Sequence, residues 1–177
     1  MSKMGFSKGF NVQLATLFGI GRIPGGGTWA SLAVLLIALY EQNAETASFL
    51  AFFALIIGPN AYRKLTTFVD SEDPKEYVLD EVIGMGIAIS GVYIFTRIFN
   101  QFSFDFIESL SAIDELFILT FIVFRFFDIS KIGPVGWVES NPNEKAYNRV
   151  IGDDIMAALL CIIFVIIFLS VNLWIMQ

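Results

Sequence analysis

The sequence predicts an all-α fold, a polytopic membrane bundle of about five transmembrane or membrane-embedded helices with an amphipathic helix at the N-terminus. Hydrophobic residues occupy 56% of the 177 positions, and the mean hydropathy of +0.70 is far above that of a soluble domain. The apolar residues gather in five stretches whose lengths favour helices over strands. No internal repeat or second domain is evident, so residues 1–177 are expected to form a single membrane-embedded domain.

The N-terminal segment comes first, and its two lysines precede an apolar stretch that glycine and polar residues interrupt. We expect it to remain as an interfacial helix and not to be a signal peptide. The first apolar stretch is short, so irregular backbone before it is expected to enter the membrane where protein or water covers it. The predicted helices are 28–40, 47–57 (continuing to 62 if the helix passes Pro59), 82–99, 116–127 and 155–176.

The last helix is the clearest candidate for a membrane span. No residue from Met156 to Met176 is charged, and at about 1.5 Å per residue this run crosses a hydrocarbon core of about 30 Å. If the five helices alternate in direction, 10 of the 11 Lys and Arg residues fall on one side and only Arg97 on the other. The positive-inside rule makes the first side cytoplasmic, together with the N-terminus.

Composition excludes several kinds of chemistry. The chain has no histidine, and its one cysteine, Cys161, lies in the middle of the last apolar helix. Histidine nucleophiles, histidine acid–base pairs, cysteine metal clusters and disulfides are therefore excluded. A net charge of -6 provides no basic patch for nucleic acid. Carboxylates, lysine, arginine and hydroxyls remain for any catalysis.

The alternating direction of the five predicted helices places five carboxylates on the cytoplasmic face. They are Asp80, Glu81, Asp128, Asp153 and Asp154. Each acidic pair could simply cap a helix N-terminus. As a group, however, they would repel one another at a low-dielectric boundary unless a cation compensated them. Hard oxygen ligands without histidine or cysteine point to Mg²⁺, or else Mn²⁺. Not all five need to bind the metal directly.

Basic residues accompany these acids. Arg125 and Asp128 are three residues apart on one helical face, and Lys131 follows three residues later if that helix continues. The two cations could snorkel to lipid head groups, or they could clamp a phosphate. The glycine-rich turn 25–27 ahead of Thr28 would let backbone N–H groups approach an anion. The combination suggests phosphoryl chemistry on a lipid head group.

In these segments the sequence resembles the phosphatidylglycerophosphatase A family of bacterial membrane phosphatases. The resemblance covers most of the chain, through "GIGRIPGGGTWASL", "EDPKEYVLDEVIGM", "FIVFRFFDISKIGP" and "GDDIMAAL" in that order. The chain departs from the family pattern where "NEKAYNRVIGDD" replaces a glycine-rich stretch, and also around Gly26, Ala30 and Ile132.

The resemblance implies Mg²⁺-dependent hydrolysis of phosphatidylglycerophosphate to phosphatidylglycerol and phosphate, a step of phospholipid biosynthesis, at the cytoplasmic surface of the bacterial inner membrane. By position it implies that the five carboxylates form the metal site and the catalytic centre. It also implies that Thr28, Arg125 and Lys131 lie near the phosphate. The partner it implies is a phospholipid substrate, and no pattern in the sequence predicts an oligomeric state.

The expected mechanism is direct attack on phosphorus by a metal-activated water, with a carboxylate accepting the proton. An aspartyl-phosphate intermediate on Asp153 or Asp80 is the alternative. Other functions left open are a phosphatase or phosphotransferase for another lipid phosphate, a membrane transporter and a membrane scaffold. A transporter fits less well because the acids gather at one face and do not cross the bilayer.

Overall fold

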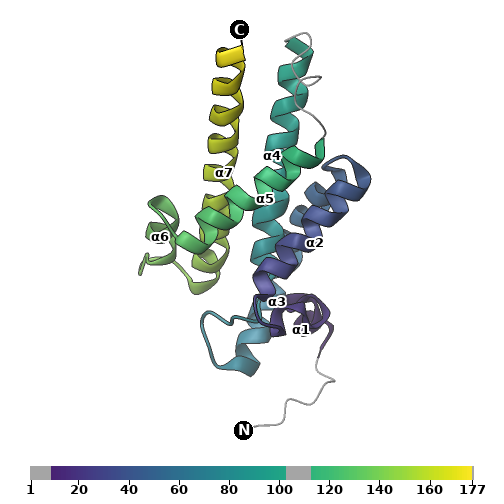
Figure 1. Ribbon diagram of the computed structural model, residues 1–177. Helices are drawn as coiled ribbons and strands as arrows, with labels where there is room; N and C mark the ends of the chain where they lie inside the picture. Colours follow the sequence, from purple (N-terminus) through teal and green to yellow (C-terminus); the bar gives the residue numbers. More distant parts are fainter. Residues whose placement is uncertain (1–8, 103–112, 177) are drawn as a thin grey trace.

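The computed structural model describes residues 9–102 and 113–176, and every regular element in these ranges is a helix (Figure 1). The all-α prediction is confirmed for this part of the chain. Residues 1–8, which belong to the predicted N-terminal helix, lie outside the described residues. The elements are α1 (Phe10–Ala15), the 3₁₀ helix η1 (Leu17–Arg22), α2 (Gly26–Glu41), α3 (Glu45–Val69), α4 (Leu79–Phe102), α5 (Ile113–Ser130), α6 (Pro134–Glu139) and α7 (Ala146–Met176).

Within residues 9–102 and 113–176, two helices are long and apolar enough to cross a membrane, α4 over Leu79–Ile98 and α7 over Ala146–Asn172. The two differ in their surroundings, because 61% of the α4 segment is buried inside the protein but only 33% of the α7 segment. Helix α7 therefore exposes much of its apolar surface, including Ile163, Ile167 and Val171. Helix α2 is apolar but has only 16 residues, so the two long spans are what length and composition support.

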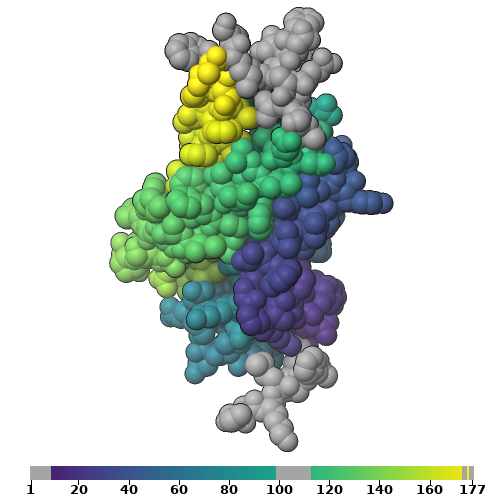
Figure 2. All heavy atoms as spheres, in the orientation of Figure 1, coloured from purple at the N-terminus to yellow at the C-terminus, as the bar shows by residue number. Residues whose placement is uncertain are grey.

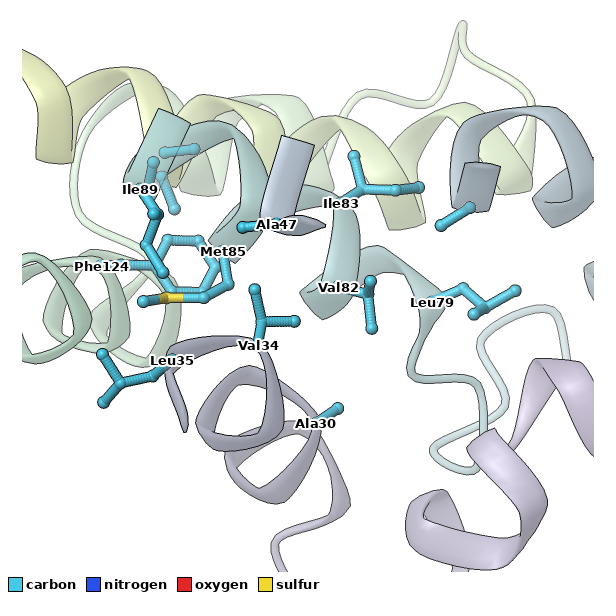
Figure 3. Packing of buried hydrophobic residues seen from close by; sticks show 14 of the residues in the cluster. Ala30, Val34, Leu35, Ala47, Leu79, Val82, Ile83, Met85, Ile89 and Phe124 are labelled. Atoms are coloured by element: carbon cyan, nitrogen blue, oxygen red, sulfur yellow. The ribbon is translucent and has the colours of Figure 1, made fainter. Parts of the chain in front are cut away.

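Helix α4 is the centre of the fold and packs against α2, α3, α5 and α7. Figure 3 shows Met85 of α4 beside Phe124 of α5, with Val34 of α2 directed toward them. Gly84 permits this packing, because a Cβ at that position would lie 2.8 Å from the Phe124 ring and 3.0 Å from the Asp154 carbonyl oxygen. The first turns of α4 are thus held against both α5 and α7.

Several helix boundaries differ from the predicted ones. Helix α7 begins at Ala146, nine residues before the predicted start, so Asp153 and Asp154 lie within the helix and do not cap its N-terminus. Helix α3 continues through Pro59 as far as Val69, well beyond the predicted end. Helix α5 ends at Ser130, because Lys131 takes a left-handed conformation (φ 50°) while its N–H donates to the Phe127 carbonyl. The turn leads into α6, a short helix that the apolar pattern did not predict.

The predicted site residues lie away from the end of the molecule where the C-terminal turns of α7 project. Figure 1 shows the starts of α2 and α4 near α1 and the start of α7 near α6, while the last turns of α7 extend in the opposite direction. In the space-filling view, α2, α5 and α6 cover much of the near face, and α7 projects beyond it (Figure 2).

Candidate active site

A cavity of about 410 Å³ lies where the first turn of α4, the end of α5 and the early turns of α7 meet. All five predicted carboxylates and Lys131 line it. The remaining lining comes from the α3–α4 connection, α6 and the start of α7. The lining residues are Glu72, Asp73, Pro74, Lys75, Tyr77, Asp80, Glu81, Asp128, Lys131, Glu139, Ala146, Arg149, Val150, Asp153 and Asp154.

Three of the carboxylates form a compact group of oxygen ligands. Asp80 and Glu81 from α4 and Asp154 from α7 each place an oxygen within 4.8 Å of the others. Glu81 Oε2 and Asp154 Oδ1 are buried and have no hydrogen-bond partner among residues 9–102 and 113–176. Buried acceptors without partners are costly, and a small divalent cation would satisfy them. The donor set therefore fits Mg²⁺ or Mn²⁺.

The other two carboxylates, Asp128 and Asp153, have basic partners. Lys131 Nζ donates to Asp153 Oδ2, and it lies 3.7 Å from Asp128 Oδ1 and 3.8 Å from Glu139 Oε1. Burial alone would lower the pKa of Lys131, but the hydrogen bond to Asp153 and the charges of Asp153 and Asp128 raise it above its ordinary value. The Lys131 ammonium group therefore stays protonated at neutral pH.

Arg125 extends this arrangement toward α2. Its Nη1 lies 2.5 Å from Asp128 Oδ2, and its Nη2 donates to Thr28 Oγ1 at 3.1 Å. Thr28, Arg125, Asp128, Lys131 and Asp153 thus form a continuous set of polar contacts from α2 through α5 to α7. The structure brings all eight predicted site residues together, although Thr28 and Arg125 lie beside the cavity and do not line it.

The sequence was compared with known protein families. The family model for phosphatidylglycerophosphatase A matches residues 13–169, nearly the whole chain. The chain belongs to the phosphatidylglycerophosphatase A family. Members of this family are phosphatases, so the predicted resemblance and enzyme class are confirmed. Comparison with curated proteins and with solved structures gave no match.

In this family member the glycine-rich start of α2 approaches an anion of the protein itself. A Cβ on Gly27 would overlap the carboxylate of Glu81, so only glycine allows Glu81 to lie against the first turn of α2. The N-terminus of a helix carries partial positive charge, which favours a carboxylate there. The predicted anion-binding turn therefore contacts Glu81 in the structure.

Sequence reasoning missed several cavity residues. Arg149 stands four residues before Asp153, and this helical spacing could have placed both on one face. Glu139 gave no such signal, because it arrives through the unpredicted α6. Eight carboxylates and three basic side chains line the cavity, and Arg125 beside it pairs with Asp128, so the carboxylates outnumber the basic side chains by four. Such an imbalance favours the binding of cations.

Proposed function

We propose that this phosphatase hydrolyses phosphatidylglycerophosphate to phosphatidylglycerol and inorganic phosphate, as a step of phospholipid biosynthesis. The observation that carries the proposal is the division of the acidic residues within one cavity. In the described part of the chain, three carboxylates have no basic partner, and two are paired with Lys131 and Arg125. A metal-dependent phosphatase needs both parts, since it holds a metal ion and also offsets the charge of the phosphoryl group.

Asp80, Glu81 and Asp154 would hold Mg²⁺, or Mn²⁺ in its place. When bound, the metal supplies neutralisation of phosphate oxygens and a lower pKa for a water molecule. Asp128 and Asp153 have a different role, because their contacts fix the positions of the Arg125 and Lys131 side chains. Arg125 is held between Asp128 and Thr28, and Lys131 is held mainly by Asp153.

The chain's own groups then carry the reaction. Lys131 Nζ and the Arg125 guanidinium offset charge that develops on the phosphoryl oxygens. A carboxylate of the cavity accepts a proton from the attacking water. The steric course at phosphorus tests this direct route, with a substrate whose phosphoryl group is made chiral by sulfur and oxygen isotopes. Inversion of configuration is expected for one direct attack by water, whereas retention would show two displacements and an aspartyl-phosphate intermediate.

We also propose that the protein is a multi-pass protein of the bacterial inner membrane, with five membrane-embedded helices and a cytoplasmic active face. The bias of Lys and Arg toward one side supports this topology. Because Cys161 is the one cysteine, a Cys161→Ala background allows single cysteines to be placed at Asn141 and Asn43. A membrane-impermeant thiol reagent added to intact spheroplasts should label position 43 and spare position 141. The reverse pattern refutes the topology.

The activity test measures phosphate release from phosphatidylglycerophosphate in mixed micelles, with Mg²⁺ and with a chelator. Asp154→Asn and Asp153→Asn should each lose about 100-fold or more in kcat/KM, because each removes a charged group from the site. Asp114→Asn is the matched control, since Asp114 lies at the opposite end of α5 and binds Gln42. Full activity of the Asp154 variant, or of the chelated enzyme, refutes the metal assignment. Preference for phosphatidic acid would point to another lipid phosphate as substrate.

A further inference from the structure

Arg149 is the cavity cation that neither the family motifs nor the proposed mechanism uses. It lines the cavity wall from the first turn of α7, and its side chain is 26% exposed. Its Nη2 lies 3.3 Å from Glu72 Oε2, and its Nη1 donates to the Glu144 carbonyl oxygen at 3.2 Å. Figure 1 shows the start of α7 close to the α3–α4 connection that carries Glu72.

The position of Arg149 relates it directly to the predicted catalytic residues. It precedes Asp153 by four residues, so both side chains lie on one face of α7, about 6 Å apart along the helix axis. Asp153 in turn holds Lys131. Arg149 therefore stands one helical turn from the Lys131 end of the cavity, on a rigid element.

The basic residues of the cavity differ in how firmly they are held. Lys131 contacts three carboxylates, those of Asp153, Asp128 and Glu139. Among the residues that the structure describes, Arg149 has one acidic partner, Glu72, whose side chain is 83% exposed. Ion pairs with such an exposed partner contribute little and exchange readily. A guanidinium group also matches two phosphate oxygens at once, which a lysine ammonium group cannot do.

The surplus of carboxylates in the cavity explains why an entering phosphate would need Arg149 as a partner. A phosphate dianion that enters a cavity in which carboxylates outnumber basic side chains needs cations beyond those already engaged. Arg149 is the lining cation with a planar donor fork and a weak partner. We propose that Arg149 is a phosphate-binding residue, which exchanges Glu72 for oxygens of the phosphomonoester in the substrate and of the phosphate product. This inference rests on the proposed phosphatase function.

The test measures the binding of inorganic phosphate to the detergent-solubilised protein by calorimetry, at constant Mg²⁺, together with product inhibition of lipid hydrolysis. Arg149→Gln should raise the Kd and the inhibition constant for phosphate about tenfold, because it removes a charge-assisted hydrogen bond. Glu72→Gln should lower both constants about two- to fivefold, because it removes the competing carboxylate. Arg149→Lys should restore part of the lost affinity.

Arg63→Gln is the matched control, because Arg63 of α3 lies outside the cavity and binds Asn60. Its phosphate affinity should equal that of the wild type. If the pair with Glu72 were only structural, the variants at 149 and 72 would weaken phosphate binding equally, and this outcome overturns the inference. An unchanged Kd in Arg149→Gln overturns it as well. Absence of lipid hydrolysis by the wild type would instead refute the proposed function.

Discussion

Replacing Gly27 by alanine should separate activity from stability. Gly27 is the second residue of α2 and has ordinary helical geometry, so alanine fits the backbone and should stabilise the helix by up to about 1 kcal/mol. Its Cβ, however, would occupy the place of the Glu81 carboxylate. Glu81 has a flexible side chain and can turn away, so the chain should fold with the carboxylate displaced from Asp80 and Asp154.

The size of the effect follows from that displacement. Misplacing a reactive group by about 1 Å can cost about 100-fold in rate. We therefore expect Gly27→Ala to lose about 10- to 100-fold in kcat/KM and to need more Mg²⁺ for half-maximal activity. The assay is phosphate release across a Mg²⁺ titration, with thermal unfolding of the same samples.

Gly25 provides the matched control. It has φ 73°, and a Cβ there meets no atom within 4 Å. Gly25→Ala should thus cost about 1–2 kcal/mol of stability, from the left-handed conformation alone, while the folded enzyme keeps its Mg²⁺ requirement. Gly27→Ala should therefore lose activity and keep its stability, whereas Gly25→Ala should lose stability and keep its activity. Wild-type activity and Mg²⁺ dependence in Gly27→Ala would refute the placement of Glu81 in the site.

Two further predictions concern Lys131 and the packing at Gly84. Lys131→Met should reduce kcat/KM by about 100-fold or more, because it leaves Asp153 buried without its cation, and Lys131→Arg should retain more activity than Lys131→Met. Equal losses in the two variants would show that the positive charge is not what matters. Gly84→Ala should lower the melting temperature, since overpacking against the Phe124 ring and the Asp154 backbone costs about 1–3 kcal/mol. A melting temperature equal to that of the wild type would contradict the close contact of α4 with α5 and α7.

The sequence predicted the helices well where apolar runs were long. The stretch 155–176 lies within α7 and 82–99 within α4, because a long uncharged run has few alternatives to a helix. Helix α6 escaped prediction, since its position depends on the left-handed turn at Lys131 and on Gly133, with φ 62°. The sequence leaves open whether α3 passes through Pro59, but the continuation from residue 62 to Val69 was not predicted, because polar residues follow the apolar run there.

For the site, local motifs identified residues but not their partners. Asp80, Glu81 and Asp154 could be named from the sequence, yet their separation from the pair Asp128 and Asp153 depends on how three helices meet. The periodicity of a single helix cannot show that Lys131 contacts Asp128 and Asp153 and not the other three carboxylates. The contact of Glu81 with Gly27 is of the same kind, because it joins two helices that are distant in the sequence.

The length of α7 relates the site to the bilayer. Its 31 residues span about 46 Å, which exceeds a hydrocarbon core of about 30 Å by about 16 Å. If the C-terminal end of α7 lies at the far boundary, the near boundary falls at about Met156, where the charged residues also end. Asp153 and Asp154 then stand at the edge of the hydrocarbon, and the first turns of α7 lie among the head groups. A lipid phosphate could therefore reach Lys131 and the carboxylates while its acyl chains stay in the membrane.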